Sequence, residues 1–199
     1  MLKVLLAYRS QDLGDAWEQH FGLVRNVEIV NADITTIDCD AVVSPANSFG
    51  FMDGGLDLAL SERFGWDLQS RVRSAIDELP EQELLIGKSL VFPTNDKQIP
   101  WVVVSPTMRV PMSFNIASSV NAYLAKALLL AAESHHGIET IAVPGLCTGV
   151  GRMPAATSAT QMYAAYCEIV LGKRKRYVDF GEAQRGQLDL NPNGMIWDF

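Results

Sequence analysis

Two glycine-rich segments hold the residues of this chain that are best suited to chemistry. Residues 45–57 contain Gly50, Gly54 and Gly55, and residues 145–154 contain three further glycines. Glycine lets a backbone approach a ligand closely, and a helix that starts beside such a loop presents free N–H groups and its positive dipole end to an anion. We therefore expect each segment to bind a phosphate, and both together to hold the two halves of a diphosphate. The alternative is that each is a connecting turn, because turns also use glycine.

Other common binding chemistries are not indicated. Neither glycine segment has the GK[ST] of a Walker motif or the spacing of GxGxxG. The cysteines, Cys39, Cys147 and Cys167, are widely spaced and form no CxxC pair, so we expect no metal site, no disulfide framework and no cofactor. The net charge of −7 argues against binding of a nucleic-acid backbone, which relies on lysine and arginine. A small anion held by backbone N–H groups remains compatible with that charge.

The elements that carry these segments follow an alternating pattern. Both segments come directly after short apolar runs, at 41–44 and 140–144, that predict buried strands. Further strands are predicted at 2–8, 27–30, 89–93 and 101–105, the last two as a hairpin or meander, and helices at 13–21, 56–76 with a break near Gly65, 116–131 and 154–172. This alternation predicts an α/β fold with helices on both faces of a sheet and ligands at the carboxyl ends of its strands.

Length and composition favour one domain. With 199 residues, of which 48% are hydrophobic and 20% charged, the chain can bury one substantial core. We expect residues 1–172 to form a single domain that includes an N-terminal strand and helix. Residues 173–199 show no clear period, and we expect a tail that packs on the domain or is partly disordered. The apolar start is too short for a membrane span and lacks the features of a signal, so we expect a cytoplasmic protein without membrane contact.

Four short segments together resemble the macrodomain family in order and spacing. They read NADIT at 31–35, VVSPAN at 42–47, GGLD at 54–57 and PGLCTGVGRMP at 144–154. In that family a GDI[TV] segment precedes a VNAAN strand end, glycines ending in VD open the next helix, and an STGV[YF] loop closes the site. The interval from Asn47 to Asp57 is that of the hydrolase-type members. The resemblance, over roughly residues 27–170, implies a three-layer α/β/α macrodomain with a central mixed, largely parallel sheet.

The resemblance also implies that the partner is ADP-ribose or an ADP-ribosylated substrate. Asp33 would accept a hydrogen bond from the adenine amino group, and the backbone of Ile34 would bind the adjacent ring nitrogen. The alternative for Asp33 is a helix or turn cap. Arg152 would approach a phosphate or be an exposed loop arginine. Phosphate contacts, mostly through backbone N–H groups, are implied for Gly54, Gly55, Leu56, Thr148, Gly149, Val150 and Gly151.

Asn47 and Asp57 are the implied catalytic residues. The Asn47 amide would hold the distal ribose, and Asp57 would activate or position water. Their structural alternatives are an asparagine that tolerates a turn and an acid that favours the first turn of a helix. A nearby diphosphate would raise the pKa of Asp57 and a helix N-terminus would lower it, so the sequence leaves the direction open.

The implied activity is hydrolysis of mono-ADP-ribosyl esters, either protein-linked ADP-ribose or O-acetyl-ADP-ribose. The alternatives are a non-catalytic ADP-ribose-binding module and an ADP-ribose 1″-phosphate phosphatase. No oligomeric state is predicted.

Two positions depart from the family pattern. Ser44, followed by Pro45, stands where many members have asparagine, and Gly151 stands where they have an aromatic residue. Losing that aromatic opens the wall over the distal ribose, which favours a larger substituent or an altered rate. Residues 108–111 are either another rim of the cleft or a structural turn. The aromatic that would stack on adenine stays open among Phe180, Trp197 and Phe199.

Overall fold

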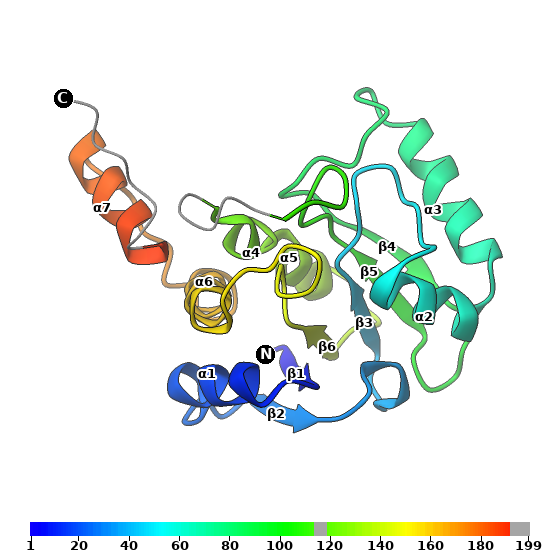
Figure 1. Cartoon of the computed structure of the whole chain (residues 1–199), viewed down its shortest axis with the longest axis horizontal. Helices are drawn as coiled ribbons and strands as arrows, with labels where there is room; N and C mark the ends of the chain where they lie inside the picture. The colour runs from blue at the N-terminus through cyan, green and yellow to red at the C-terminus, as the bar shows by residue number, and fades with distance from the viewer. Residues whose placement is uncertain (114–118, 192–199) are drawn as a thin grey trace.

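The computed structural model describes residues 1–113 and 119–191. Its centre is a six-stranded sheet in the order β2-β1-β6-β3-β5-β4 (Figure 1). The β4–β5 pair is antiparallel, as the predicted hairpin requires, and the other neighbouring pairs are parallel. The strands are β1 (Lys3–Tyr8), β2 (Val27–Asn31), β3 (Ala41–Ser44), β4 (Leu90–Pro93), β5 (Trp101–Val104) and β6 (Thr140–Pro144).

Helices cover both faces of this sheet (Figure 1). The helices of the described residues are α1 (Gln11–Phe21), the 3-10 helix η1 (Ile34–Thr36), α2 (Gly55–Phe64), α3 (Asp67–Asp77), α4 (Asn121–Leu124), α5 (Ala127–Ser134), α6 (Ala155–Ile169) and α7 (Phe180–Leu190), of which α7 lies beyond α6 and away from the sheet. Successive strand residues face opposite ways, so Val4 and Leu6 pack with α1, α4, α5 and α6, while Leu5 and Ala7 pack with α2 and α3. The predicted three-layer α/β/α fold with a mixed, largely parallel sheet is confirmed.

One predicted helix is divided. The apolar period at 116–131 corresponds to two short helices, because the chain leaves helical geometry at Ala125, where φ is −64° and ψ is 1°. Residues 114–118 lie outside the described residues. The buried face also differs from the predicted one, because Ala122, Leu128 and Ala132 are buried while Tyr123 is only half-buried and Leu124 is 37% exposed. The apolar pattern therefore missed the break and gave only Leu128 of the buried face correctly.

The segment beyond residue 172 contains the helix α7, which the sequence analysis did not predict. Asp179 accepts a hydrogen bond from the Glu182 N–H at 2.8 Å, and Glu182 accepts one from the Val178 N–H at 2.8 Å. Asp179 is therefore the N-cap of the helix, and Glu182 also holds the N–H of the residue before Asp179. Tyr177 packs against Gly186, where an added Cβ would clash with the Tyr177 hydroxyl. None of the described helices is long and apolar enough to cross a membrane.

Candidate functional site

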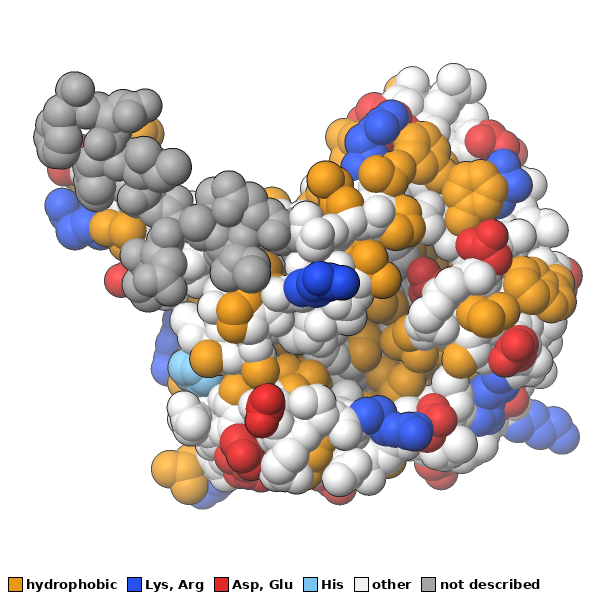
Figure 2. Space-filling view, viewed as in Figure 1, with side chains coloured by type: hydrophobic (Ala, Val, Ile, Leu, Met, Phe, Trp, Pro, Cys, Tyr) orange, Lys and Arg blue, Asp and Glu red, His pale blue; other side chains and the backbone are white. Residues whose placement is uncertain are grey.

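The strand order brings the expected site segments to one edge of the sheet. Strands β2, β1, β6 and β3 are consecutive parallel neighbours, so their carboxyl ends lie side by side. Asp33 follows β2, Arg9 follows β1, residues 145–154 follow β6 and residues 45–57 follow β3. In the space-filling view the molecule is hollowed where Figure 1 places β3 and the start of α2 (Figure 2). A ligand at this edge would meet all four segments.

The loop after β3 is held in shape by Asn47. Its Oδ1 accepts hydrogen bonds from the N–H groups of Phe49 and Phe51 at 3.1 and 3.3 Å, and its Nδ2 donates to the Phe51 carbonyl at 2.7 Å. Both acceptor positions of the amide oxygen are thus used within the loop, and one Nδ2 hydrogen has no partner among these bonds. Asn47 therefore shapes the loop and can offer one N–H donor to a ligand.

Helix α2 opens toward the hollow through glycine. Gly54 is its N-cap and supplies no side-chain oxygen to the first-turn N–H groups. A Cβ built at Gly54 or at Gly55 would meet no heavy atom within 4 Å, and Gly55 has a φ of +57°. Leu56 is half-buried and follows directly in the first turn. The helix therefore presents uncapped N–H groups beside open space, an arrangement that favours an anion.

Asp57 lies in the first turn of α2 and is buried. The Ser44 hydroxyl at the end of β3 donates a 2.6 Å hydrogen bond to its Oδ1. Burial raises the pKa of Asp57 to about 6, although the hydrogen bond from Ser44 opposes the rise. The sequence left open whether the pKa of Asp57 is raised or lowered, and in the structure it is raised. Ser44, which the sequence analysis noted as a departure from the family pattern, is the partner of the acid.

The loop after β6 closes on itself. The Thr148 hydroxyl donates to the Gly145 carbonyl at 3.0 Å, and the Arg152 N–H donates to the Gly149 carbonyl at 3.0 Å. A Cβ at Gly149 would meet no heavy atom within 4 Å. Val150 and Arg152 are exposed, whereas Gly151 is buried. The backbone at Gly149 therefore has free space beside it, as it does at the start of α2.

Asp33 caps the 3-10 helix η1. Its Oδ1 accepts from the Thr35 N–H at 3.0 Å and from the Thr35 hydroxyl at 2.8 Å. Its Oδ2 lies 3.1 Å from Nη1 of Arg9. The hydrogen bonds from Thr35 hold the pKa of Asp33 below its usual range, with a smaller contribution from Arg9. Ile34, the next residue, is buried. Asp33 thus acts as the helix cap that the sequence analysis gave as the alternative to adenine binding. Its lowered pKa keeps the carboxylate ionised at neutral pH.

Residues 107–109 brace the Asn47 loop from the side. Met108 forms a parallel bridge with Asn47, and the Arg109 carbonyl accepts from the Ser48 N–H at 3.1 Å. The Arg109 side chain forms an ion pair with Glu83 and lies over the Phe49 ring. Residues 108–111 were predicted to be either a rim of the cleft or a structural turn. Met108 and Arg109 of this segment support the Asn47 loop.

A buried polar chain extends this support to the C-terminal helix. Thr107 donates to the Pro45 carbonyl at 3.2 Å, and Asn121 donates to the Thr107 carbonyl at 2.6 Å. The fully buried Gln161 donates to the carbonyls of Ser119 at 2.8 Å and Leu190 at 3.3 Å. Sequence reasoning missed Thr107, Asn121 and Gln161, because buried polar residues look like ordinary polar positions until their partners are known.

Other candidate features lie away from this edge. Phe180 is 77% exposed on α7, which Figure 1 places far from the end of β2, while Trp197 and Phe199 lie outside the described residues. Within residues 1–113 and 119–191, no three His, Cys, Asp or Glu side chains group as a metal site would need.

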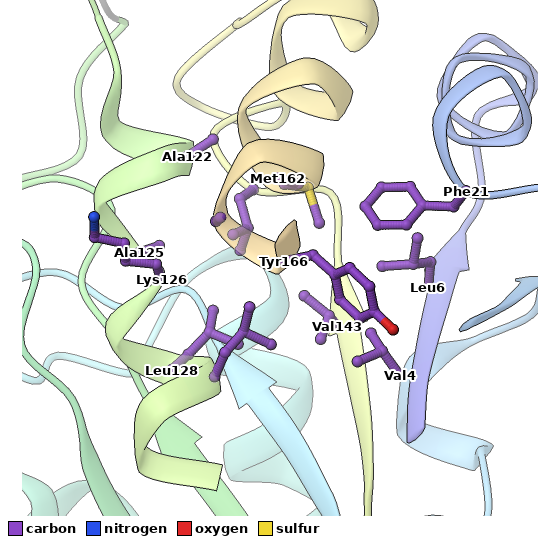
Figure 3. Close-up of a pocket in the computed structure, with 13 residues that line it drawn as sticks. Val4, Leu6, Phe21, Ala122, Ala125, Lys126, Leu128, Val143, Met162 and Tyr166 are labelled. Carbon is purple, nitrogen blue, oxygen red and sulfur yellow. The ribbon is translucent and has the colours of Figure 1, made fainter. Parts of the chain in front are cut away.

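A cavity of about 30 Å³ lies between α4, α5, α6 and β1 (Figure 3). It is lined by core residues such as Leu6, Val143 and Met162, and it is too small for a nucleotide.

Comparison with known proteins identifies the family. The model of the Macro domain family matches residues 43–162, which include both glycine segments and Asp57. The chain belongs to the macro domain family. An uncharacterized protein of Aeropyrum pernix is 31% identical over 157 residues, 77% of each chain. A protein of Enterobacter sp. named O-acetyl-ADP-ribose deacetylase is 29% identical over 135 residues, 67% of this chain and 72% of that one.

Solved macrodomain structures share the fold. The macrodomain of Mycobacterium tuberculosis DarG has a TM-score of 0.59 at 20% identity, covering 70% of this chain and 88% of that chain. A mutant of the Oceanobacillus iheyensis macrodomain with ADPR has a TM-score of 0.54 at 19% identity, covering 71% and 89%. These structures share the fold, and the match of the Macro domain family model confirms the predicted family.

Proposed function

We propose that this macrodomain binds ADP-ribose along the carboxyl edge of its sheet and hydrolyses mono-ADP-ribosyl esters there. The observation that carries the proposal is Asp57, a buried carboxyl with a pKa raised to about 6, beside the uncapped start of α2. A general base works best when its pKa lies near the working pH. The names of relatives support the ligand, since one is an O-acetyl-ADP-ribose deacetylase and a structural neighbour holds ADPR.

The ligand would lie in the order in which the segments leave the sheet. Asp33 and Ile34 bind adenine at the β2 end. The diphosphate lies between the two glycine loops and accepts from their backbone N–H groups, with the exposed Arg152 beside it. The loop after β3 contributes the N–H groups of Gly54, Gly55 and Leu56. The loop after β6 contributes those of Thr148, Gly149, Val150 and Gly151. Binding by backbone dipoles explains how a chain of net charge −7 takes an anionic ligand.

Catalysis would take place at the distal ribose, beside β3 and α2. Asn47 keeps the loop closed and offers its remaining Nδ2 hydrogen to a ribose hydroxyl. Asp57 takes a proton from water as the water oxygen attacks the ester carbonyl carbon. The bond from that carbon to the ribose oxygen then breaks, and the departing oxygen receives the proton, which leaves ADP-ribose and a carboxylic acid. This route uses no metal or cofactor.

The experiment compares wild type with Asp57→Asn on two esters, O-acetyl-ADP-ribose and a glutamate-linked mono-ADP-ribosyl peptide. The amide keeps the shape and the Ser44 hydrogen bond but cannot accept the proton. We expect ADP-ribose affinity to change by less than about threefold and the turnover rate to fall by about 10²–10⁴. The matched control is Asp53→Asn, an exposed acid of the same loop, which should keep full activity.

Three outcomes would contradict parts of the proposal. Unchanged turnover in Asp57→Asn removes its role as base. Tight binding without product from either ester identifies a non-catalytic binding module. Release of inorganic phosphate from ADP-ribose 1″-phosphate, with both esters left intact, identifies a phosphatase.

A further inference from the structure

Arg9 lies in the middle of the sheet edge formed by the carboxyl ends of β2, β1, β6 and β3, and the proposed function gives it no role. It follows β1 directly and precedes α1, so the connection between these elements consists of Arg9 and Ser10. Because β1 lies between β2 and β6, Arg9 leaves the sheet between Asp33 and the second glycine loop. Its side chain is 74% exposed, and its Nη1 lies 3.1 Å from Oδ2 of Asp33. Among the described residues, Asp33 is its one charged partner.

The hydrogen bonds of Asp33 divide between its two oxygens. Oδ1 is taken by the N–H and the hydroxyl of Thr35, which fix the carboxylate on η1. Oδ2 is taken by Arg9 alone. A carboxylate oxygen can accept two hydrogen bonds, so Oδ2 keeps one position for a further donor. A guanidinium carries five N–H donors, and one is used here. The pair therefore presents a free acceptor position beside free donors.

We propose that Arg9 is a specificity-determining residue that binds N7 of adenine while Asp33 binds the 6-amino group. This inference rests on the proposed function, since it assumes that adenine lies at Asp33. The 6-amino donor and the N7 acceptor are neighbours on one edge of the base. An acceptor and a donor held side by side match that edge, and Arg9 already contacts the oxygen that would face the amino group. Guanine and hypoxanthine carry an oxygen in place of the amino group, which would face the Asp33 carboxylate unfavourably.

The test removes N7 from the ligand and the guanidinium of Arg9 from the protein, separately and together. Calorimetry measures the affinities of ADP, 7-deaza-ADP and IDP for wild type and for Arg9→Ala, after ADP-ribose binding to wild type has been measured. 7-deaza-ADP lacks only the N7 acceptor, and IDP lacks the amino group. We expect the 7-deaza change to weaken binding to wild type by about three- to tenfold, the size of one net hydrogen bond, and to leave binding to Arg9→Ala unchanged. IDP should bind more weakly than ADP to both proteins, because both retain Asp33.

The matched control is Arg25→Ala, which removes the same charge from the exposed turn before β2, at the opposite edge of the sheet. It should keep the full 7-deaza penalty. An equal 7-deaza penalty in wild type and Arg9→Ala would overturn the N7 contact, even if Arg9→Ala lowered affinity for ADP. A wild type that binds no ADP-ribose would overturn the proposed function together with this inference, so the two failures are distinguishable.

Discussion

At the scale of single residues, the site depends on how Asp57 is held. The carboxyl is buried in the first turn of α2, and within the described residues its one side-chain partner is the Ser44 hydroxyl at 2.6 Å. Burial disfavours the charged form and outweighs that hydrogen bond, so the pKa of Asp57 rises to about 6. The same carboxyl is still largely ionised at neutral pH and can accept a proton.

This raised pKa makes a prediction about stability. The pKa of Asp57 is higher in the folded chain than the ordinary 3.8, so protonation favours folding below about pH 4, and that stabilisation is lost as the pH rises through about 6. Above pH 6 the buried charge costs on the order of 2–3 kcal/mol. We therefore expect Asp57→Asn to gain that amount in free energy of unfolding, relative to wild type, between pH 4 and pH 7. Urea denaturation across this range measures it.

Asp53→Asn, which changes an exposed acid of the same loop, is the control variant for this measurement. A constant difference between Asp57→Asn and wild type would show that the carboxyl is solvated in the folded chain. The sequence alone predicted an acid in a first helical turn. It could not predict the direction of the pKa, because burial and the contact with Ser44 join residues 13 positions apart.

At the scale of elements, two loops present backbone to the same edge. A Cβ at Gly54 or Gly149 would enter space that contains no heavy atom within 4 Å. Gly54 has a φ of −148°, which any residue adopts. We expect Gly54→Ala and Gly149→Ala to lower the free energy of unfolding by no more than about 1 kcal/mol, the larger part at the N-cap Gly54, and to weaken ADP-ribose binding at least about tenfold. Thermal unfolding and calorimetry on the same samples check both parts.

Gly172→Ala provides the contrasting control. Gly172 has a φ of +66° and open space around it, but it lies beyond α6 and outside both loops. Alanine there should cost about 1–2 kcal/mol of stability and leave affinity unchanged. If Gly54→Ala and Gly149→Ala bound ADP-ribose as tightly as wild type, the space beside these glycines would not be occupied by the ligand.

The elements themselves were largely predictable. Short apolar runs placed all six strands to within a residue or two, and β3 and β6 have the predicted bounds. The helix α7 was missed because it buries only Gly186 and so has a weak apolar period. The Asp179-x-x-Glu182 pattern, with Asp179 as the N-cap, was the signal that could have revealed it. The break at Ala125 had no comparable signal in the sequence.

At the scale of the whole molecule, the site depends on strand order. Residues 33 and 57 lie at the two ends of a row formed by β2, β1, β6 and β3, which no local pattern in the sequence specifies. The family resemblance implied this arrangement, and the order of the six-stranded sheet confirms the fold. We propose that residues 1–172 are the ligand-binding unit, because α7 joins it mainly through Gln161 and adds little to either core cluster.

The most direct test is a calorimetric titration of ADP-ribose into the full chain at fixed salt, with AMP and NAD as comparators. A site that runs from Asp33 to Asp57 engages both halves of ADP-ribose, whereas AMP fills one half and NAD carries a nicotinamide on the distal ribose. We predict that ADP-ribose binds at least about tenfold more tightly than either, and that Asp33→Ala weakens it by about the same factor. No detectable binding of ADP-ribose would contradict the proposed ligand and every role assigned to these residues.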